Sequence, residues 1–205
     1  MGARISGIAA GVVVFLPGWE PPRLARGARR AGRVDVMELV DFEDDPARLR
    51  STFALFPSGV AALSAVVEGR PTVLVASSFQ VGISADPPLV LFAVQRTSRS
   101  WPVLRRAGRI GVSVLGEVHD AAARQLASRA DDRFRGIPTT TLPNGAHFVQ
   151  GAPVWFDTSV HGEFPAGDHD VVLLRVHALG TDPGAEPLVF QSSTFRSLVP
   201  RQPVA

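Results

Sequence analysis

The hydrophobic pattern becomes regular at residue 45 of this 205-residue chain. Asp45 followed by Pro46 is typical of the first turn of a helix, where an aspartate caps the free N–H groups and proline fits the first helical position. Apolar residues then recur at spacings of four and three, at Leu49, Phe53 and Phe56. The pattern predicts a short amphipathic helix that ends at Pro57 and Gly59.

Beyond this helix, runs of β-branched and apolar residues are separated by short turns rich in glycine and proline. The runs predict strands at 60–67, 72–79, 89–94, 110–115, 155–163, 171–179 and 187–191. Two helices are predicted, at 101–106 and 120–128. Because most strands follow one another without a crossover helix, we expect a mainly β fold, an antiparallel barrel with a few peripheral helices.

The composition narrows the class of protein. With 45% hydrophobic and 20% charged residues the chain can bury a sizeable core, which excludes a disordered protein. The absence of cysteine excludes disulfides, thiolate metal sites and a cysteine nucleophile. Cysteine usage leaves the compartment open, and we expect a cytoplasmic protein.

The basic pI of about 10.7 does not indicate a nucleic-acid-binding protein, because the net charge is only +2. All 21 basic residues are arginine, and lysine, tyrosine and cysteine are absent, so little titrates below arginine. Residues 1–33 hold six arginines against Glu20, whereas the rest of the chain has 15 basic and 18 acidic residues. The arginine run lacks interleaved aromatic residues, so we expect neither a nucleic-acid partner nor a membrane, although a basic arm leaves both alternatives open.

Residues 1–44 form an arm that precedes the regular pattern. The apolar stretch 5–16 is too short to span a bilayer and is followed by a poor signal-peptide cleavage site. We interpret the arm as a flexible basic segment or as a start assigned too early, with Met37 as a candidate initiator. The domain proper is expected at 45–200.

No single residue type identifies a reaction. Ser77, Ser78 and Ser84 lack a nucleophile-elbow context, and the five histidines never fall at metal-ligand spacing, so no metal site is predicted. His161 and His177 lie in alternating strands, where surface or packing roles are the ordinary interpretation. A glycine pattern of the Walker or Rossmann type is also absent.

Three segments could together hold a phosphorylated planar ligand. Small and hydroxyl residues end a predicted strand at 75–84, which is also typical of an ordinary strand end. Two arginines and three hydroxyls stand at 95–102 before a helix, with Ser100 as the expected N-cap; such a turn suits a phosphate or is simply solvated. Gly167, Asp168 and His169 form the tip of the second long hairpin, where glycine and aspartate are also good turn residues.

The order of short motifs along residues 49–198, about three quarters of the chain, resembles the flavin reductase family. The motifs are Phe56-Pro57-Ser58-Gly59-Val60, Ala76 to Phe79, Asp86-Pro87-Pro88-Leu89-Val90, Ser98 to Trp101, Gly108-Arg109, Val112 to Leu115, Asp132-Arg133-Phe134 and Gly167-Asp168-His169. The resemblance implies a flavin-binding split β-barrel that forms a homodimer. It also implies hydride transfer from NADH or NADPH to FMN or FAD, with the reduced flavin supplied to a partner monooxygenase. A non-catalytic flavin- or haem-binding barrel is the alternative.

The same resemblance implies site residues by position. The wall of the flavin ring and ribityl chain corresponds to Thr72, Val73, Leu74, Val75, Ala76, Ser77 and Ser78, continued by Ala93, Val94 and Gln95. The phosphate corresponds to Ser98, Arg99 and Ser100. Gln125 and Leu126 stand where many relatives have Arg-Phe beside the cofactor. The nicotinamide region corresponds to His169, the expected catalytic residue, and to Phe190, Gln191, Ser192 and Ser193. Ser77 replaces a common Asn or Gln, and 80–85 is one residue longer than in many relatives.

Overall fold

The computed structural model describes residues 39, 41–42 and 45–199, so the predictions for the N-terminal arm lie almost wholly outside the described residues. Twelve strands dominate this part of the chain: β1 Ser58–Gly59, β2 Ala61–Val67, β3 Arg70–Ala76, β4 Gln80–Ala85, β5 Pro88–Gln95, β6 Ile110–Val114, β7 Thr139–Thr141, β8 His147–Val149, β9 Val154–Ala166, β10 His169–Thr181, β11 Val189–Gln191 and β12 Thr194–Arg196. The helices are α1 Pro46–Phe53, α2 Trp101–Leu104, η1 Glu117–His119 and α3 Asp120–Leu126. The predicted mainly β class is confirmed.

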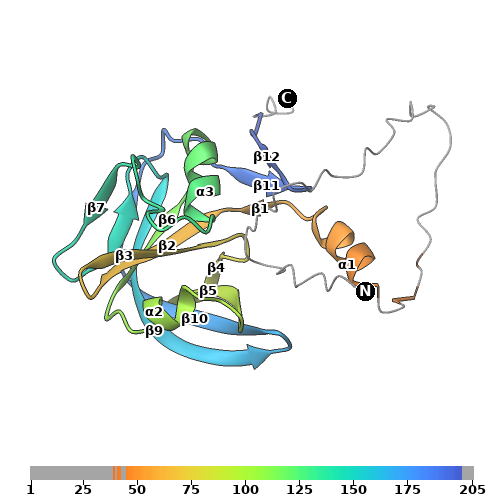
Figure 1. The fold of residues 1–205 in the computed structure, drawn as a ribbon, viewed down its shortest axis with the longest axis horizontal. Helices are drawn as coiled ribbons and strands as arrows, with labels where there is room; N and C mark the ends of the chain where they lie inside the picture. Colours follow the sequence, from red (N-terminus) through yellow and green to blue (C-terminus); the bar gives the residue numbers. More distant parts are fainter. Residues whose placement is uncertain (1–38, 40, 43–44, 200–205) are drawn as a thin grey trace.

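Seven strands form one antiparallel sheet in the order β3-β2-β6-β9-β10-β5-β4 (Figure 1). Its two edge strands, β3 and β4, are consecutive in the chain, so the sheet must curl until its ends approach each other. Ser78, which follows β3, bridges the gap to β5: its hydroxyl donates to the Ala93 carbonyl at 2.9 Å and accepts from the Ala93 N–H at 3.0 Å. One side chain therefore replaces part of a missing strand ladder and closes the barrel.

Tight turns and bulges shape the two long hairpins. Glu68 and Gly69, both with positive φ, join β2 to β3, as the primed hairpin turns require. The 13-residue strands β9 and β10 carry two register shifts, which leave His161 and His177 without ladder partners. Such bulges bend a strand, which lets the hairpin follow the curve of the barrel. Both histidines are exposed, as predicted for surface positions.

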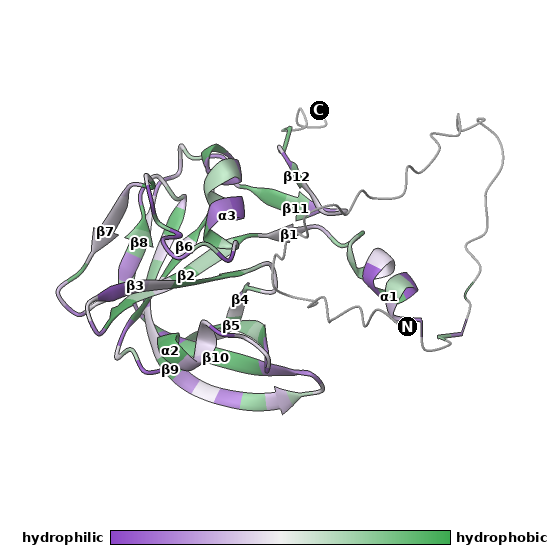
Figure 2. Ribbon diagram, viewed as in Figure 1, coloured by the Kyte–Doolittle hydropathy of each residue, from purple (hydrophilic) through white to green (hydrophobic). Residues whose placement is uncertain are grey.

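Two apolar cores lie on the two faces of the sheet. The first fills the barrel, with Phe92 of β5 at its centre and Trp101 of α2 packed edge-on against it, ring centroids 5.2 Å apart. The second lies between the outer face of β2 and β3 and the helix α3. Strand β3 alternates between the two, since Leu74 belongs to the first and Val73 to the second. In Figure 2 the colouring is apolar along β5 and on α2, and apolar and polar colours alternate along β9.

Several elements differ from the sequence predictions, and the strands β1, β4, β7, β8 and β12 have no predicted counterpart. Helix α1 begins at Pro46 with Asp45 as its cap, as predicted, but none of its side chains is buried, and Phe53 is 54% exposed. Strand β4 was missed because Gln80 pairs with Leu91 and Ser84 with Leu89, so residues 81–83 bulge out and break the alternation. Helices α2 and α3 end at Leu104 and Leu126, each two residues before the predicted end at 106 or 128.

Candidate flavin site

The site starts where β3 ends beside β5. The paired hydrogen bonds of Ser78 with Ala93 hold these two predicted segments in direct contact. Two residues further along β5, Gln95 stands opposite His169 in the ladder with β10. The structure thus brings together three of the segments predicted from the motifs: the end of β3, the end of β5 and the hairpin tip.

The turn after β5 carries the predicted phosphate residues. Its geometry is fixed by Ser98, whose N–H donates to the Gln95 carbonyl at 3.0 Å and whose hydroxyl accepts from the Trp101 N–H at 3.2 Å. Ser100 occupies the N-cap position of α2, as expected, but its side chain makes no cap bond and accepts from another residue. The hydroxyl of Ser98 bonds to the first N–H of the helix instead. Arg99 is exposed and forms no ion pair within the described part of the chain.

Arg133, to which the sequence prediction gave no role, lies against the same turn. Its guanidinium donates to the Ser100 hydroxyl at 3.1 Å and to the Leu126 carbonyl at 3.4 Å, which ties the turn to the segment after α3. It is partly buried, and this desolvation lowers the pKa of Arg133. No carboxylate pairs with it among residues 45–199. Arg133 belongs to the Asp132-Arg133-Phe134 motif of the family resemblance.

Gln125 and Leu126 lie behind this arginine. The Gln125 amide donates to the carbonyls of Arg133 at 3.0 Å and Arg135 at 2.8 Å, so it holds the loop that presents Arg133. Leu126 is fully buried in the second core. Both residues shape the surroundings of Arg133, Gln125 through its amide nitrogen and Leu126 through its place in the core.

His169 begins β10, directly after a turn made by Gly167 and Asp168. Its Nδ1 lies 2.7 Å from the Asp168 carboxylate, and a hydrogen bond from His169 is the largest cause that lowers the pKa of Asp168. The residue is only 8% exposed, and Nε2 is buried without a hydrogen-bond partner in the described structure. A buried nitrogen without a partner costs free energy, so it marks a position where a ligand can supply the missing bond.

Several predicted wall residues lie in the cores. Their side chains are buried with at most 4% exposure, so they pack against other side chains and shape the site from behind; they are Val73, Leu74, Val75, Ala76 and Val94. Thr72, Ser77, Ser78, Ala93 and Gln95 keep partly exposed surface. The surface available to a ligand is therefore more polar than the predicted set.

The last predicted segment lies elsewhere on this chain. Phe190 packs against Phe195 at 5.5 Å in the second core, and the Gln191 amide donates to the Leu55 carbonyl at 2.9 Å. Ser192 and Ser193, both with positive φ, turn the chain from β11 into β12. The contacts of residues 190–193 thus lie at the end of α1, and no described contact joins them to His169 or Arg99.

The residues that converge suit a flavin phosphate. The Ser98–Ser100 turn supplies hydroxyls, and two arginines stand at this turn, one exposed and one partly buried without a carboxylate. Guanidinium groups and hydroxyls are the groups that bind phosphate best, and a desolvated arginine gains most from an anion. His169 Nε2, by contrast, is buried and has no described partner.

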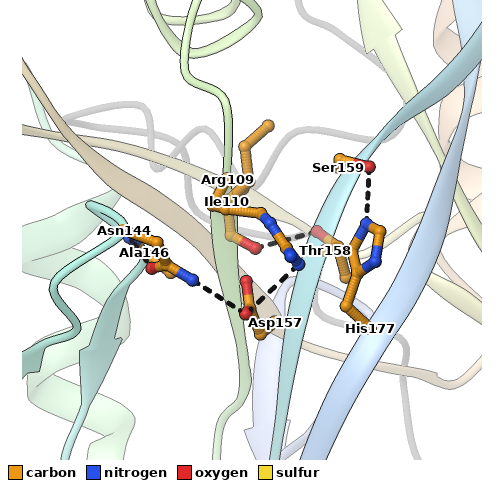
Figure 3. A network of polar contacts seen from close by, with 8 residues as sticks. All are labelled: Arg109, Ile110, Asn144, Ala146, Asp157, Thr158, Ser159 and His177. Carbon is orange, nitrogen blue, oxygen red and sulfur yellow. Dashed lines mark hydrogen bonds and ion pairs between the residues drawn. The ribbon is translucent and has the colours of Figure 1, made fainter.

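A second polar cluster lies on the barrel wall, where Arg109 and Asn144 reach the Asp157 carboxylate from two sides (Figure 3). The distances to Asp157 Oδ2 are 3.3 Å from Arg109 and 3.0 Å from Asn144. The nearby His177 contacts the Ser159 hydroxyl at 2.7 Å, and its pKa is lowered by desolvation and then by Arg109. No carboxylate orients His177 through a described hydrogen bond, so this serine and histidine do not form a catalytic triad.

The remaining described features are a hollow away from the predicted site and the arrangement of possible metal ligands and helices. A hollow of about 440 Å³ lies at residues 116–118 and 184–186, none of which was predicted for the site. In the described ranges, no group of three or more histidine, aspartate or glutamate side chains is placed to hold a metal ion. None of the helices formed by these residues is long and apolar enough to cross a membrane.

Comparison with known proteins gives the same result as the motifs. Residues 53–199 match the model of the flavin reductase like domain. The chain is 32% identical over 154 residues to a flavin reductase of Pseudomonas putida, which covers 75% of this chain and 90% of the relative. It is 33% identical over 160 residues to the reductase subunit HsaB of a flavin-dependent monooxygenase of Rhodococcus jostii, covering 78% and 82%.

The fold is also that of solved relatives. The NADH:FAD oxidoreductase SgcE6 of Streptomyces globisporus, solved in complex with NAD and FAD fragments, superposes with a TM-score of 0.73 at 31% identity, over 80% of this chain and 98% of that one. The split-barrel prediction is thereby confirmed. With a family model that covers most of the domain and relatives above 30% identity, the chain belongs to the flavin reductase family.

Proposed function

We propose that this protein reduces FMN or FAD with NADH or NADPH and supplies the reduced flavin to a partner monooxygenase. When both nucleotides are bound, the chemistry is hydride transfer from nicotinamide C4 to flavin N5, and the reactive atoms belong to the nucleotides. The protein has to bind and align them, which can contribute about 7–11 kcal/mol to a reaction between two molecules. The observation that carries the proposal is the convergence of the Ser78, Ser98–Ser100 and His169 segments at one end of the barrel.

The phosphate is assigned to the turn after β5. Arg99 provides an exposed guanidinium, and Arg133 provides a partly buried one anchored on Ser100. Because Arg133 has lost part of its hydration without gaining a carboxylate among the described residues, an incoming phosphate would compensate it. This supports a phosphorylated flavin, FMN or FAD, over riboflavin.

The flavin ring is assigned to the partly exposed residues at the ends of β3 and β5. Ser77 and Gln95 offer polar groups for the ring edge, while Ala93 leaves the close approach that a planar ring needs. The hydroxyl of Ser78 already bonds to the Ala93 backbone, so its assigned role is to hold this surface in place. His169 is assigned to the nicotinamide side of the same site.

We propose further that the protein is a homodimer. The outer positions of β5 and β10 form an apolar platform of Leu91, Val171 and Leu173, next to the 54% exposed Phe164 of β9. Exposed apolar patches of this kind are typical of protein interfaces. The platform runs directly into Gln95 and His169, so a second copy seated on it would also close the site.

The oligomer is tested by sedimentation velocity of Leu173→Glu against Leu179→Glu. Both leucines lie on β10, but Leu179 is 68% exposed at the far end of the strand, away from the platform. We expect dimers for the wild type and Leu179→Glu and monomers for Leu173→Glu. A monomeric wild type contradicts the dimer.

The activity is tested by mixing purified protein with NADH or NADPH and with FMN, FAD or riboflavin while the nicotinamide absorbance is followed. We expect oxidation that requires both protein and flavin. An anaerobic reaction passed through an ultrafiltration membrane is expected to release reduced flavin into the filtrate, as delivery to a partner requires. No oxidation with any flavin would instead indicate a flavin- or haem-binding module without turnover.

A further inference from the structure

The apolar platform on β5 and β10 continues into a charged residue at its end away from the hairpin tip. On β10 the side chains of Val172 and Leu174 belong to the core inside the barrel. Because successive side chains of a strand point to opposite faces, Val171, Leu173 and Arg175 lie on the outer face. Arg175 therefore extends the platform on the same surface.

This end of the platform is basic. Arg175 is exposed and forms no ion pair within the described part of the chain. Its ladder neighbours are Ser159 on β9 and Leu89 on β5, both uncharged. Arg109, just before β6, is already paired with Asp157 at 3.3 Å. The positive charge of Arg175 is thus not compensated by the residues around it.

The opposite end of the platform is the hairpin tip, which presents a carboxylate. The Asp168 side chain is 84% exposed. A hydrogen bond with His169 is the largest cause that lowers the pKa of Asp168, so the group is ionised at neutral pH. The next carboxylate, Asp170, is already paired with Arg96 at 3.1 Å. Asp168 is therefore the carboxylate at this end that can accept an ion pair from outside the chain.

A two-fold dimer can bring these ends together in two ways. Both copies use the same face, and two sheets packed face to face lie about 10 Å apart. An axis parallel to β10 lays each end on the same end of the other copy, so Arg175 faces the partner's Arg175. An axis across the strands reverses the second β10 and lays the basic end on the other hairpin tip. Opposite charges favour the reversed arrangement, and like charges oppose the other one.

The apolar residues are centred for the reversed arrangement. Val171 and Leu173 flank position 172, and an axis at this level brings Arg175 opposite the partner's His169, next to the partner's Asp168. Phe164 widens the apolar surface near this level, since its ring lies over Gly162, where a Cβ would be only 3.2 Å from the ring. Gly162 is the ladder partner of Leu173. The same axis therefore joins apolar to apolar and basic to acidic surface.

We propose that this protein dimerises with the two β10 strands antiparallel and that the partner's Arg175 binds the Asp168 carboxylate at the hairpin tip. The inference rests on the homodimer of the proposed function and adds its orientation and its charged contact. Because the dimer is symmetric, the ion pair forms twice. The second copy then contributes a guanidinium to the segment that holds His169 in each candidate flavin site.

The orientation is tested by cross-linking, since the chain contains no cysteine of its own. Asp168→Cys and Arg175→Cys are made separately, co-expressed and treated with a short bismaleimide, and each variant alone is the control. We expect covalent dimers from the co-expressed pair. Neither variant alone should cross-link, because equal positions lie about 20 Å or more apart when the strands are reversed.

Covalent dimers of either variant alone would overturn the proposal, because they place equal ends together. The absence of any cross-link in protein that sediments as a dimer would also overturn it, while the homodimer would stand. A monomeric wild type would remove the homodimer, and this inference with it. The assay for flavin reduction is independent of all three outcomes.

Charge reversal gives a second readout. We expect Arg175→Asp to raise the Kd of the dimer about tenfold at low salt, because two ion pairs become two contacts between like charges. Adding Asp168→Arg exchanges the two charges and should return the Kd to within about threefold of the wild type.

Arg70→Asp is the matched control for sedimentation velocity at the same salt concentration. Arg70 is an exposed arginine on β3 without an ion pair in the described ranges, and its reversal should leave the Kd unchanged. Failure of the double exchange to restore the dimer, or an equal loss in Arg70→Asp, would overturn the pairing of Arg175 with Asp168.

Discussion

Two buried histidines in this protein are held in opposite ways. His119, at the end of η1, accepts a hydrogen bond from the Gly116 N–H at 3.1 Å on Nδ1 and donates from Nε2 to the Gln150 carbonyl at 2.8 Å. His169 has one partner, Asp168, and a second nitrogen without one in the described structure. Both are less than 10% exposed. Burial therefore does not distinguish these two histidines, but the use of their ring nitrogens does.

A third histidine shows that an unpaired ring nitrogen alone does not indicate a ligand contact. His147 on β8 bonds to the Thr141 hydroxyl at 2.7 Å and also has a buried Nε2 without a described partner. Its ring packs edge-on against Phe134, centroids 4.7 Å apart, within an apolar setting, and burial lowers its pKa. An unpaired nitrogen thus indicates a ligand contact only where other site residues converge, as they do around His169.

The largest effect is expected on stability, from His119→Ala. The change leaves the Gly116 N–H and the Gln150 carbonyl without their partner and opens a cavity, so it should lower the free energy of unfolding by about 3 kcal/mol. Urea unfolding measures this loss. The kcat of the folded fraction should stay at the wild-type value, and a stable but inactive variant would break the comparison.

The reverse outcome is expected for His169→Ala. Loss of the nicotinamide contact should lower kcat/KM for NADH by about 30-fold, or about 2 kcal/mol of transition-state stabilisation. Oxidised flavin should bind within a few-fold of the wild type. The unfolding free energy should fall by about 1 kcal/mol, less than for His119→Ala, because the removed ring leaves a cavity but satisfied only the exposed Asp168. Steady-state kinetics and flavin titration check both parts; unchanged turnover would remove His169 from the site.

The smallest of these effects is the pH dependence that His147 gives to the free energy of unfolding. Because burial lowers its pKa in the folded state, the unfolded chain takes up the proton first as the pH falls below about 6.5. The contribution of His147 to the free energy of unfolding is therefore fully present above about pH 6.5. It is lost as the pH falls toward the lowered pKa, with a slope of at most about 1.4 kcal/mol per pH unit.

The measurement is the difference in unfolding free energy between pH 7.5 and 5.5. His147→Asn keeps a hydrogen-bonding group for Thr141 and should flatten this difference. His161→Asn changes an exposed histidine on the β9 bulge and is the matched control, expected to follow the wild type. Equal pH dependence in all three proteins would rule out His147 as the source.

The fold could be predicted from local signals where they are strong. Asp45 with Pro46 fixed the start of α1, and glycine-containing turns fixed both long hairpins. Strand β4 could not be predicted, because residues 81–83 bulge against one residue of β5 and remove the period of two. The apolar side of α1 is visible in the sequence, but the sequence does not say that the described residues leave it exposed.

The site was predictable only in part, for a related reason. The order of motifs identified the family, and the roles of His169 and the Ser98–Ser100 turn follow from that resemblance as predictions. The role of Arg133 depends on a contact to Ser100, 33 residues away along the chain, which no local pattern encodes. Likewise, Val73–Ala76 and Val94 read as wall residues by position, while their burial between two cores appears only when both faces of β3 and the interior of the barrel are seen.

The central claim is that the turn after β5 holds the flavin phosphate, and it is tested most directly by comparing FMN with riboflavin. We expect Arg99→Ala to raise the Kd of FMN by about tenfold, since a charge-assisted bond to phosphate is lost, and to leave the Kd of riboflavin unchanged. Arg106→Ala, which removes an arginine paired with Glu68 at 3.2 Å, should change neither. Equal weakening of both flavins by Arg99→Ala, or no weakening of either, would contradict the assignment.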